Sequence, residues 1–384
     1  MIIINAEIYT MEGESFKRGC VWIENGKIKK IAEVINIDGE KIIDADGRML
    51  FPGFIDAHSH LGMWEDGVDF EGADGNEATD PITPQLRAID AINPMDRTFE
   101  EAYQGGITAT STGPGSANVI SGQFAVIKTY GKRIDDMIMK EPAAIKCAFG
   151  ENPKKVYGDQ HKSPSTRMAT AALLRETLME AKDYLEKKES DDEDKHPDYD
   201  MQMEALIPLL KKEIPLKAHA HRADDIFTAI RIAKEFDLNM TLDHCTEGHL
   251  ITEYLKDENM PAIVGPSFSE RSKVELRNLT FETPGVLNKA GIKVAIMTDH
   301  PVIPIQYLTL CAALAAKAGL DKQEALKAIT IYAAEILGVS DRIGSLKEGK
   351  DADMVLWDGH PFDIESKVNM TIIDGKIVYN SMEN

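Results

Sequence analysis

Short apolar runs separated by tight-turn signals mark both ends of the chain. The runs are residues 2–8, 20–24 and 27–32 at the amino end and residues 353–357, 370–373 and 376–379 at the carboxyl end. Asn25-Gly26 and Asp374-Gly375 stand between paired runs, and such dipeptides predict β-hairpins. Because neither set of strands can bury both of its faces alone, we expect the two ends to join as one small β-sandwich.

Between the two ends, short apolar runs alternate with longer helical patterns. The predicted strands are residues 49–57, 107–111, 143–148, 216–219, 239–243, 261–264 and 293–297, with an eighth in 123–129, and the predicted helices include residues 165–188, 223–236 and 322–337. Ser165 is the expected N-cap of the first helix. Alternation of strand and helix is typical of a parallel sheet with crossover helices. We predict an α/β fold, a (β/α)8 TIM barrel at residues 51–342, with the β-sandwich built from residues 1–50 plus 343–384.

The composition excludes several functions. The chain has 384 residues, of which 43% are hydrophobic and 28% charged, so it can bury a large core. Its net charge of −21 repels nucleic-acid phosphates and anionic lipids, and the acidic run at residues 189–194 predicts a solvated loop. We expect a small-molecule substrate, no nucleic acid and no membrane partner, while a homo-oligomer stays open.

Cysteine spacing and the amino terminus bear on the compartment. Cys20, Cys147, Cys245 and Cys311 are widely spaced, which argues against a disulfide framework and for a reducing compartment. The chain begins with a β-like run rather than a basic segment, and no apolar stretch approaches about 18 residues. The sequence therefore predicts a cytoplasmic protein.

Histidine and acidic residues follow the apolar runs at their carboxyl ends, where a barrel places its catalytic groups. His58 and His60 come after the run at residues 51–55, and residues two apart on a strand point to the same face. Two imidazoles can then converge on one ion. Such a pair also occurs by chance or in core packing, so it becomes informative only with partners.

The partners appear in chain order, each at the end of its own apolar run. They are His219 and His221, then His244, and finally Asp299. Imidazole and carboxylate suit zinc or a similar divalent ion, and three or four such ligands with an open position make a catalytic site. Such an ion lowers the pKa of bound water, and Asp299 can take the proton and pass it to the leaving group.

Two longer motifs resemble the amidohydrolase superfamily. They are FPGFIDAHSH at residues 51–60 and ALKAITIYAAEILGVSDRIGSLKEGKDADMVLWD at residues 325–358, which together frame nearly the whole chain. The chain is most similar to the imidazolonepropionase-like and prolidase-like branch. The resemblance implies a (β/α)8 barrel with a small β-sandwich from both termini, in agreement with the patterns above.

The resemblance also implies roles for individual residues. In that superfamily the first-strand histidines bind one metal ion, the fifth- and sixth-strand histidines bind a second, and the last-strand aspartate is ligand and base. Carried over by position, these residues are His58, His60, His219, His244 and Asp299. His221 competes with His219, because both lie on one strand face. We favour His219 as the ligand, with His221 facing the substrate.

The segment AIKCA at residues 144–148 resembles the fourth strand of binuclear members, in which a carboxylated lysine bridges two metal ions. An unmodified lysine, with a pKa of about 10.4, is a poor ligand until it becomes an anionic carbamate. The resemblance thus implies that Lys146 bridges two ions, expected to be zinc. An outward-pointing or salt-bridged lysine is the alternative, and Glu151 is the rival bridging carboxylate.

Several neighbouring residues have weaker claims to the site. The side chains that could polarise a carbonyl or hold a carboxylate are Tyr157, Arg167, Arg222 and Arg271. Each residue of this kind is more often an ordinary surface or helix residue. His300 follows Asp299 and could orient it or simply pack in a loop. Met63 and Trp64 could wall the substrate pocket or cover the barrel mouth.

Three functions are compatible with these motifs. The leading hypothesis is a metal-dependent hydrolase that cleaves the amide C–N bond of a dipeptide-like or cyclic amide substrate with a metal-activated water. The alternative is a mononuclear imidazolonepropionase-like hydrolase or an aminohydrolase (deaminase), which needs no bridge at Lys146. A metal-free scaffold protein on the same barrel is the third, and the full ligand set argues against it.

Overall fold

The computed structural model describes residues 1–37 and 39–382, and strands from both ends of the chain form one eight-stranded sheet. The strands are β1 (Ile2–Ile8), β2 (Phe16–Glu24), β3 (Lys27–Ala32), β4 (Ile42–Asp44), β5 (Met49–Pro52), β14 (Met354–Trp357), β15 (Val368–Ile373) and β16 (Lys376–Asn380). Their order is β16-β15-β14-β5-β1-β2-β3, with β4 beside β1. The pairing of the two ends is thus confirmed, whereas the strands form one hydrogen-bonded sheet and not the two of a sandwich.

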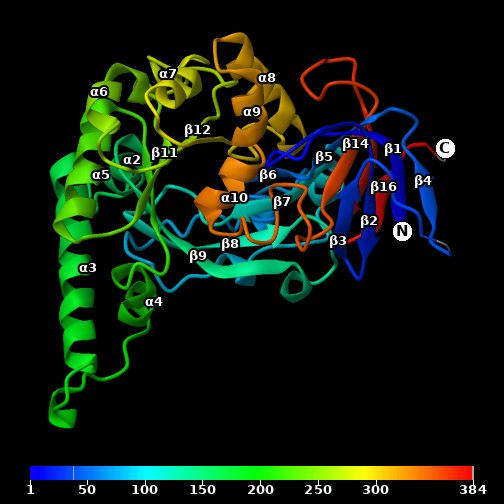
Figure 1. The fold of residues 1–384 in the computed structure, drawn as a ribbon. Helices are drawn as coiled ribbons and strands as arrows, with labels where there is room; N and C mark the ends of the chain where they lie inside the picture. Colours follow the sequence, from blue (N-terminus) through cyan, green and yellow to red (C-terminus); the bar gives the residue numbers. More distant parts are fainter. Residues whose placement is uncertain (38, 383–384) are drawn as a thin grey trace.

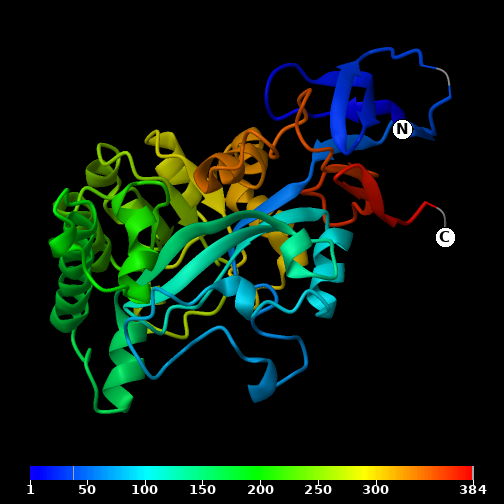
Figure 2. The same ribbon diagram turned by 90° about the horizontal axis from the view of Figure 1, so that it is seen from below.

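This terminal sheet lies at one end of the molecule and contains the first strand, β1, and the last strand, β16 (Figure 1 and Figure 2). The β2–β3 turn approaches the β15–β16 turn so closely that a Cβ built on Gly26 would lie 3.0 Å from the backbone oxygen of Asp374. Gly26 also has a φ of 76°, which favours glycine. Apolar side chains from both ends share one core, among them Ile3, Leu50 and Met354.

A second eight-stranded sheet forms the barrel. Its strands, in spatial order, are β6 (Phe54–Ser59), β7 (Ile107–Thr112), β8 (Ile120–Lys128), β9 (Ile138–Ala148), β10 (Leu216–Ala220), β11 (Met240–His244), β12 (Ala262–Val264) and β13 (Val294–Ile296). β8 runs antiparallel to both neighbours, and the other pairs are parallel. The links at residues 113–119 and 129–137 are too short for a parallel crossover, which takes about 10–12 residues or more. The predicted TIM-like α/β barrel is confirmed, with one strand reversed.

The predicted strand at residues 49–57 divides at Gly53 into β5 and β6, which belong to different sheets. The Gly53 N–H donates to the oxygen of Asp353 in the terminal segment, whereas the Phe54 N–H donates to the oxygen of Gly106 beside the barrel. A Cβ on Gly53 would lie 2.0 Å from Thr108 Oγ1, so only glycine fits this crossing. Hydrophobicity alone does not mark the division, because both halves are buried.

Helices cover the outside of the barrel. They are α1 (Arg97–Gln104), α2 (Glu151–Asp159), α3 (Arg167–Lys188), α4 (Met201–Leu210), α5 (Ala223–Glu235), α6 (Thr252–Leu255), α7 (Thr283–Lys289), α8 (Leu308–Lys317), α9 (Lys322–Ala328) and α10 (Ile331–Leu337). The predicted N-cap Ser165 is wrong, because the Thr166 side chain accepts from the Ala169 N–H. The predicted helix at 322–337 divides at Ile329, whose oxygen accepts from the Ile55 N–H of β6.

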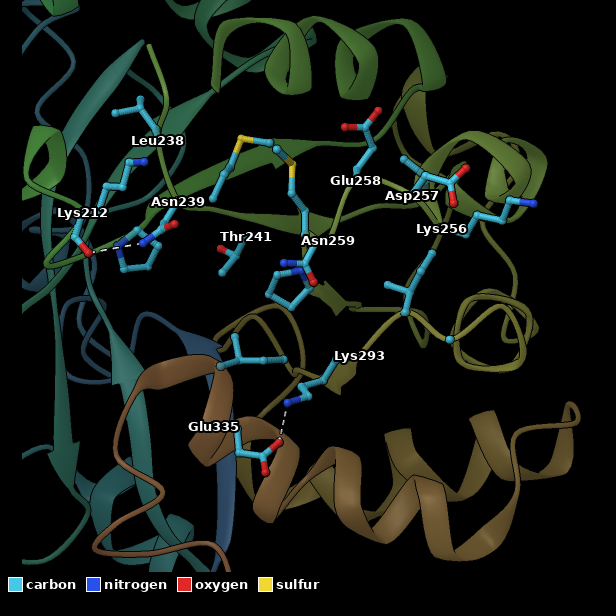
Figure 3. Close-up of a pocket in the computed structure, with 18 of the residues that line it drawn as sticks. Lys212, Leu238, Asn239, Thr241, Lys256, Asp257, Glu258, Asn259, Lys293 and Glu335 are labelled. Atoms are coloured by element: carbon cyan, nitrogen blue, oxygen red, sulfur yellow. Dashed lines mark hydrogen bonds and ion pairs between the residues drawn. The ribbon is translucent and has the colours of Figure 1, made fainter. Parts of the chain in front are cut away.

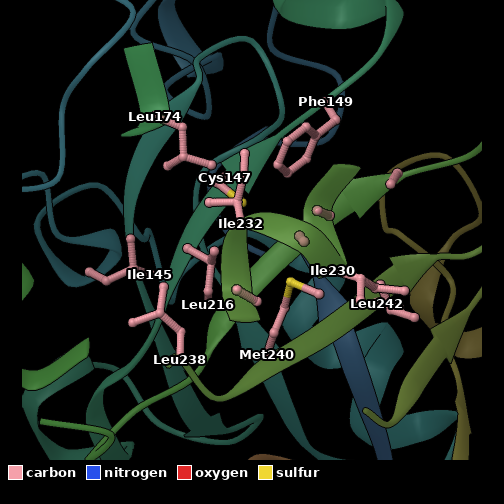
Figure 4. Packing of buried hydrophobic residues seen from close by; sticks show 14 of the residues in the cluster. Ile145, Cys147, Phe149, Leu174, Leu216, Ile230, Ile232, Leu238, Met240 and Leu242 are labelled. Atoms are coloured by element: carbon pink, nitrogen blue, oxygen red, sulfur yellow. The ribbon is translucent and has the colours of Figure 1, made fainter. Parts of the chain in front are cut away.

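The largest apolar core lies between the strands β9 to β12 and the helices α3 and α5 (Figure 4). Ile145, Leu216 and Leu242 contribute from the strands, and Leu174 and Ile230 from the helices. All four cysteines are free and buried, as expected without a disulfide framework. Within residues 1–37 and 39–382, no helix is both long and apolar enough to cross a membrane.

A buried ion cluster joins the barrel to the terminal sheet. Lys128, at the end of β8, donates to Asp353 at 2.6 Å and to Asp351 and Asp374 at 3.1 Å each. Asp351 also accepts from Arg342 at 2.8 Å. Burial alone would lower the pKa of Lys128, but the surrounding carboxylates raise it above its ordinary value. Lys128 is therefore a permanently charged structural residue.

Candidate metal centre and active site

The carboxyl ends of the barrel strands bring the predicted histidines, lysine and aspartate together. His58 lies next to the last residue of β6, Lys146 lies on β9, His219 on β10 and His244 on β11. His60, His221 and Asp299 lie in the loops after β6, β10 and β13. His58, Lys146 and Asp243 are completely buried, and the other histidines of the group are at most 7% exposed. Five strands thus point their titratable groups at one small volume.

Hydrogen bonds set the proton position on three of these histidines. The Nδ1 atoms of His60 and His244 lie 2.7 and 2.8 Å from the backbone oxygens of Gly113 and Gly265. Since a carbonyl oxygen can only accept, Nδ1 carries the proton in both rings. His58 Nδ1 likewise lies 2.8 Å from the carboxylate of Asp243. The Nε2 lone pair of each ring is therefore free for a ligand inside the barrel mouth.

The first donor cluster comprises His58, His60, His244 and Asp299. Asp299 Oδ1 lies 3.2 Å from His60 Nε2 and 3.4 Å from His58 Nε2. Burial alone would raise the pKa of Asp299, but contacts with the two histidines lower it well below its ordinary value. Donor atoms of His58, His244 and Asp299 all lie within 4.8 Å of one another.

The second donor cluster comprises His219, His221 and His244, whose donor atoms also lie within 4.8 Å of one another. Nδ1 of His219 lies 2.9 Å from Ser116 Oγ, and Nδ1 of His221 lies 2.7 Å from Thr246 Oγ1. His244 belongs to both clusters, and its Nε2 has no hydrogen-bond partner among the described residues. Both His219 and His221 therefore lie where a ligand would, although we predicted that role for His219 alone.

Lys146 lies beneath the first cluster. Its Nζ is 3.3 Å from His58 Nε2, and its nearest carboxylate oxygen, on Asp243, is 4.0 Å away. The close ion pair with Asp243 is made by Lys217, at 3.2 Å. Burial lowers the pKa of Lys146 to about 8. The outward-pointing alternative for Lys146 is therefore wrong, and the side chain has no close ion-pair partner.

The backbone around the clusters adopts uncommon conformations. Asp299, His244 and Cys245 have φ values of 55°, 67° and 48°, in the left-handed region that residues other than glycine rarely adopt. Such residues cost energy and concentrate at functional sites. Asp56 helps to hold the arrangement, because its carboxylate accepts from the backbone N–H groups of His58 and Thr298, at 3.1 Å each.

Other predicted residues lie outside the clusters. Arg222 is paired with Asp224 at 2.8 Å and, like Glu151, lines a groove of about 380 Å³, which Glu275 lines as well. Tyr157 is buried, and its hydroxyl donates to Asn118 Oδ1. The structure therefore does not bring Glu151, Arg222 or Tyr157 to the cavity that the histidines line.

The residues with weaker claims divide in the same way. Arg167 is paired with Asp225 at 2.9 Å, and Arg271 donates to the backbone oxygen of Leu279. The ring nitrogens of His300 have no hydrogen-bond partner among the described residues, so His300 does not orient Asp299 by a ring hydrogen bond. Met63 packs in the core, whereas Trp64 lines the cavity.

Two large cavities lie at opposite ends of the barrel strands. The mouth cavity, of about 600 Å³, is lined by His60, the second histidine cluster and Asp299, with Trp64, Phe268 and Val302 among its apolar walls. The base cavity, of about 640 Å³, lies at the amino ends of β10 to β13 and contains the Lys293–Glu335 ion pair of 2.7 Å (Figure 3). The unpartnered Nε2 of His244 belongs to the lining of the mouth cavity, and no histidine is among the described residues that line the base cavity, so the mouth is the candidate active site.

The sequence-based prediction missed three polar residues beside the second cluster. Glu275 Oε1 lies 3.7 Å from His221 Nε2 and 4.0 Å from His219 Nε2, and burial raises the pKa of this carboxyl. Asn152 Nδ2 lies 3.4 Å from His219 Nε2, and Lys273 donates to Asn152 Oδ1 at 2.6 Å. Glu275 and Lys273 belong to the polar loop after β12, where no apolar run marks them.

The donor set fits a divalent ion of the zinc type. Burial lowers the pKa of His58 to about 4 and that of His244 to about 3, so both rings are neutral and can act as ligands. Neutral imidazole and ionised carboxylate are suitable donors for zinc, and the unpartnered His244 Nε2 lacks only such an ion. The residues that would hold it are those of the two donor clusters.

The sequence pattern of the Amidohydrolase family matches residues 49–378, and the chain belongs to that family. It is accordingly a hydrolase acting on carbon–nitrogen bonds. A crystal structure of an amidohydrolase from Thermotoga maritima is 45% identical, covers 99% of both chains and has a TM-score of 0.96. The predicted superfamily is thus confirmed.

More distant relatives agree with the predicted branch. Amidohydrolase tasK of Hapsidospora irregularis is 30% identical over 93% of this chain, which spans only 39% of the length of tasK. An imidazolonepropionase of Klebsiella pneumoniae is 24% identical over 94% of this chain and 91% of its own length. A prolidase crystal structure covers 99% of both chains with a TM-score of 0.63 at 16% identity, which is a likeness of fold alone.

Proposed function

We propose that this protein is a binuclear, divalent-metal-dependent hydrolase that cleaves the amide bond of a dipeptide-like or cyclic amide substrate. One observation carries the proposal: two donor clusters share His244, whose buried Nε2 is unpartnered at the floor of a cavity. His58, His60 and Asp299 would hold one ion, and His219 or His221 with His244 the other, with zinc the expected metal.

Asp299 is the expected general base. A divalent ion in such a setting supplies Lewis acidity, which activates water for attack on the amide carbon. Asp299 lies beside the Nε2 atoms of His58 and His60, and its lowered pKa keeps the carboxylate ionised, so one of its oxygens can accept the water proton. Asp299 then donates this proton to the leaving nitrogen, which would otherwise depart as a poor anionic group.

Lys146 is the expected bridge between the two ions. A neutral lysine amine reacts with carbon dioxide to form an N–C bond and a carbamate, with loss of one proton from nitrogen. The depressed pKa of Lys146, about 8, supports this reaction, because an appreciable fraction of the amine is unprotonated near neutral pH. The absence of any carboxylate closer than 4.0 Å also leaves room for the charge of the carbamate.

The mouth cavity supports a substrate with a polar end and an apolar body. Lys273 lines the cavity and is 38% exposed, so its ammonium group can bind a substrate carboxylate. Trp64, Phe268 and Leu279 supply apolar contact area. A volume of about 600 Å³ suits a small molecule and supports a small-molecule substrate rather than a folded partner.

A mononuclear hydrolase or deaminase is the second candidate. Donor atoms of His58, His244 and Asp299 approach within 4.8 Å without any contribution from Lys146. Relatives with these activities are also known: imidazolonepropionase, and a 5-methylthioadenosine/S-adenosylhomocysteine deaminase of Caldicellulosiruptor saccharolyticus that is 24% identical over 99% of this chain.

A hydrolysis screen tests the proposal. The zinc-loaded protein and a chelator-treated sample are assayed against dipeptides, lactams, hydantoins and aminated heterocycles, with amine, carboxylate and ammonia measured separately. We expect metal-dependent cleavage of dipeptides or cyclic amides. Ammonia release from heterocycles alone would favour the deaminase. Equal hydrolysis in the metal-free sample would contradict a metal-dependent mechanism.

A further inference from the structure

Glu275 is a buried carboxylate that the proposed mechanism does not use. It lies in a short 3-10 helix, Val274–Leu276, in the loop between β12 and α7, and is only 1% exposed. Its Oε2 accepts from the Glu151 N–H at 3.0 Å. Its Oε1 has no hydrogen-bond partner among the described residues. A buried carboxylate oxygen without a partner is costly, so this atom requires an explanation.

Among residues 1–37 and 39–382, no lysine or arginine donates to Oε1 of Glu275. Lys273 Nζ is 4.0 Å away, beyond hydrogen-bond distance, and instead donates to Asn152 Oδ1 at 2.6 Å. The nearest nitrogens belong to the second histidine cluster: His221 Nε2 at 3.7 Å and His219 Nε2 at 4.0 Å. Three donor atoms therefore surround one small space, and none of them hydrogen-bonds to another.

We propose that Glu275 is a carboxylate ligand of the divalent ion held by His219 and His221, an inference that rests on the metal-dependent function proposed above. Zinc lies about 2.0–2.2 Å from nitrogen and oxygen ligands, so two ligands of one ion lie at most about 4.2 Å apart. The separations of 3.7 and 4.0 Å between Glu275 Oε1 and the two histidine nitrogens lie within this limit. Glu275 supplies a negative charge to a cluster that otherwise contains only neutral imidazoles.

The surrounding contacts hold the three donors in place. Thr246 and Ser116 bind Nδ1 of His221 and His219, and the Nε2 of each ring lies near Glu275, with that of His219 also 3.4 Å from Asn152 Nδ2. The Glu151 N–H fixes the other oxygen of Glu275. His219 and His221 then both act as ligands, and Glu275 links the loop after β12 to the metal centre.

Metal binding by Glu275→Gln tests the inference, with Glu270→Gln as the matched control. Glu270 lies in the same loop, carries the same charge and is exposed at the cavity. Each purified protein is titrated with zinc against a competing chelator, and cobalt-loaded samples are compared by visible absorption. We expect Glu275→Gln to bind one of its ions at least about 10-fold more weakly, a loss typical even of indirect partners of metal ligands. The cobalt spectrum should change, and Glu270→Gln should match wild type in both measurements.

The outcomes separate this inference from the function on which it rests. Wild-type zinc affinity and an unchanged cobalt spectrum in Glu275→Gln would overturn the role of Glu275 and leave the proposed function standing. A wild-type protein that binds no divalent ion would overturn both. Should Glu275→Gln fail to fold, a crystal structure of the zinc-loaded wild type decides the matter. A zinc–Oε1 distance of about 2.0–2.2 Å is expected, and a distance above about 3 Å would contradict coordination.

Discussion

Lys128 and Lys146 are buried lysines on neighbouring strands, yet their surroundings differ completely. Lys128 donates to three carboxylates at 2.6 to 3.1 Å, and its pKa is raised. Lys146 has no carboxylate closer than 4.0 Å, and burial lowers its pKa to about 8. Both residues are buried lysines, so the difference in pKa comes from the carboxylates that surround one of them and not the other.

The difference separates a structural region from a reactive one. At the junction with the terminal sheet, the buried charges neutralise one another, as stability requires. At the barrel mouth, His244 Nε2 and Glu275 Oε1 have no hydrogen-bond partner among the described residues, and His244 and Asp299 have a strained backbone, as is common at functional sites. Substitutions at the mouth should therefore affect activity more than stability, and substitutions at the junction should do the reverse.

The largest effect is expected for Asp299→Asn. Asparagine keeps the shape of the side chain but loses the basic oxygen, so turnover should fall by about 10² to 10⁴-fold. The thermal unfolding midpoint should change little. Turnover is compared at matched metal occupancy, because an amide is also a poorer ligand. Near-normal turnover of metal-loaded Asp299→Asn would mean that another group is the base.

Lys128→Met should show the opposite pattern. Removal of the lysine leaves the buried carboxylate of Asp353 without its cation, whereas Asp351 keeps Arg342, and breaking a buried ion pair costs about 3–5 kcal/mol. Urea denaturation should show this loss of unfolding free energy. The turnover of the folded protein should stay at the wild-type value. A loss of activity without a loss of stability would show that the ion cluster around Lys128 is not purely structural, and would contradict the contrast with the barrel mouth.

Lys146→Met tests whether Lys146 contributes to activity without contributing to the stability of the fold. The metal content should fall from two ions to one per chain, with a loss of activity of at least about 10-fold. The unfolding free energy of the metal-free variant should equal or exceed that of the wild type, because an unpaired buried amine is replaced by an apolar side chain. Marked destabilisation of the metal-free protein would indicate a structural role like that of Lys128.

The smallest effect is expected for the pH dependence of stability that comes from the ion cluster around Lys128. Asp351→Asn measures it. Burial alone would raise the pKa of Asp351, but Lys128, Lys27 and Arg342 lower it below its ordinary value. Because the pKa is lower in the folded state, ionised Asp351 stabilises the fold at pH values above its unfolded-state pKa of about 3.9. This stabilisation is lost as the pH falls through the folded-state pKa. At neutral pH, the unfolding free energy of the wild type should exceed that of Asp351→Asn by about 1–3 kcal/mol. This gap should shrink below pH 4 in urea denaturation series, and a gap that widens there would contradict the sign.

The repeating features of the fold could be predicted from the sequence. Apolar runs located the strands, and the position of His58, His244 and Asp299 at their ends followed from barrel geometry. The single residues at which a predicted strand or helix is interrupted could not be predicted. The division at Gly53 depends on the approach of Thr108, and the break at Ile329 depends on its hydrogen bond to β6. Both causes are tertiary contacts, which local patterns do not contain.

The candidate site shows the same limit. Site residues that lie on strands could be located from the sequence. Glu151 and Arg222 were chosen for their residue type and their nearness in sequence, but they line a groove other than the mouth cavity. Glu275 lies in a polar loop, and only the folding of that loop over the mouth brings it to His221. Loop residues are placed by contacts between distant segments, so their roles require the structure.

Anomalous diffraction at the zinc edge, from crystals of the zinc-loaded protein, tests the central claim most directly. The account predicts two peaks about 3.5 to 4 Å apart at the barrel mouth. One peak should lie against His58, His60 and Asp299, the other against the second histidine cluster, with a carboxylated Lys146 between them. A single peak with an unmodified Lys146, or zinc bound only outside the mouth, would contradict the binuclear account.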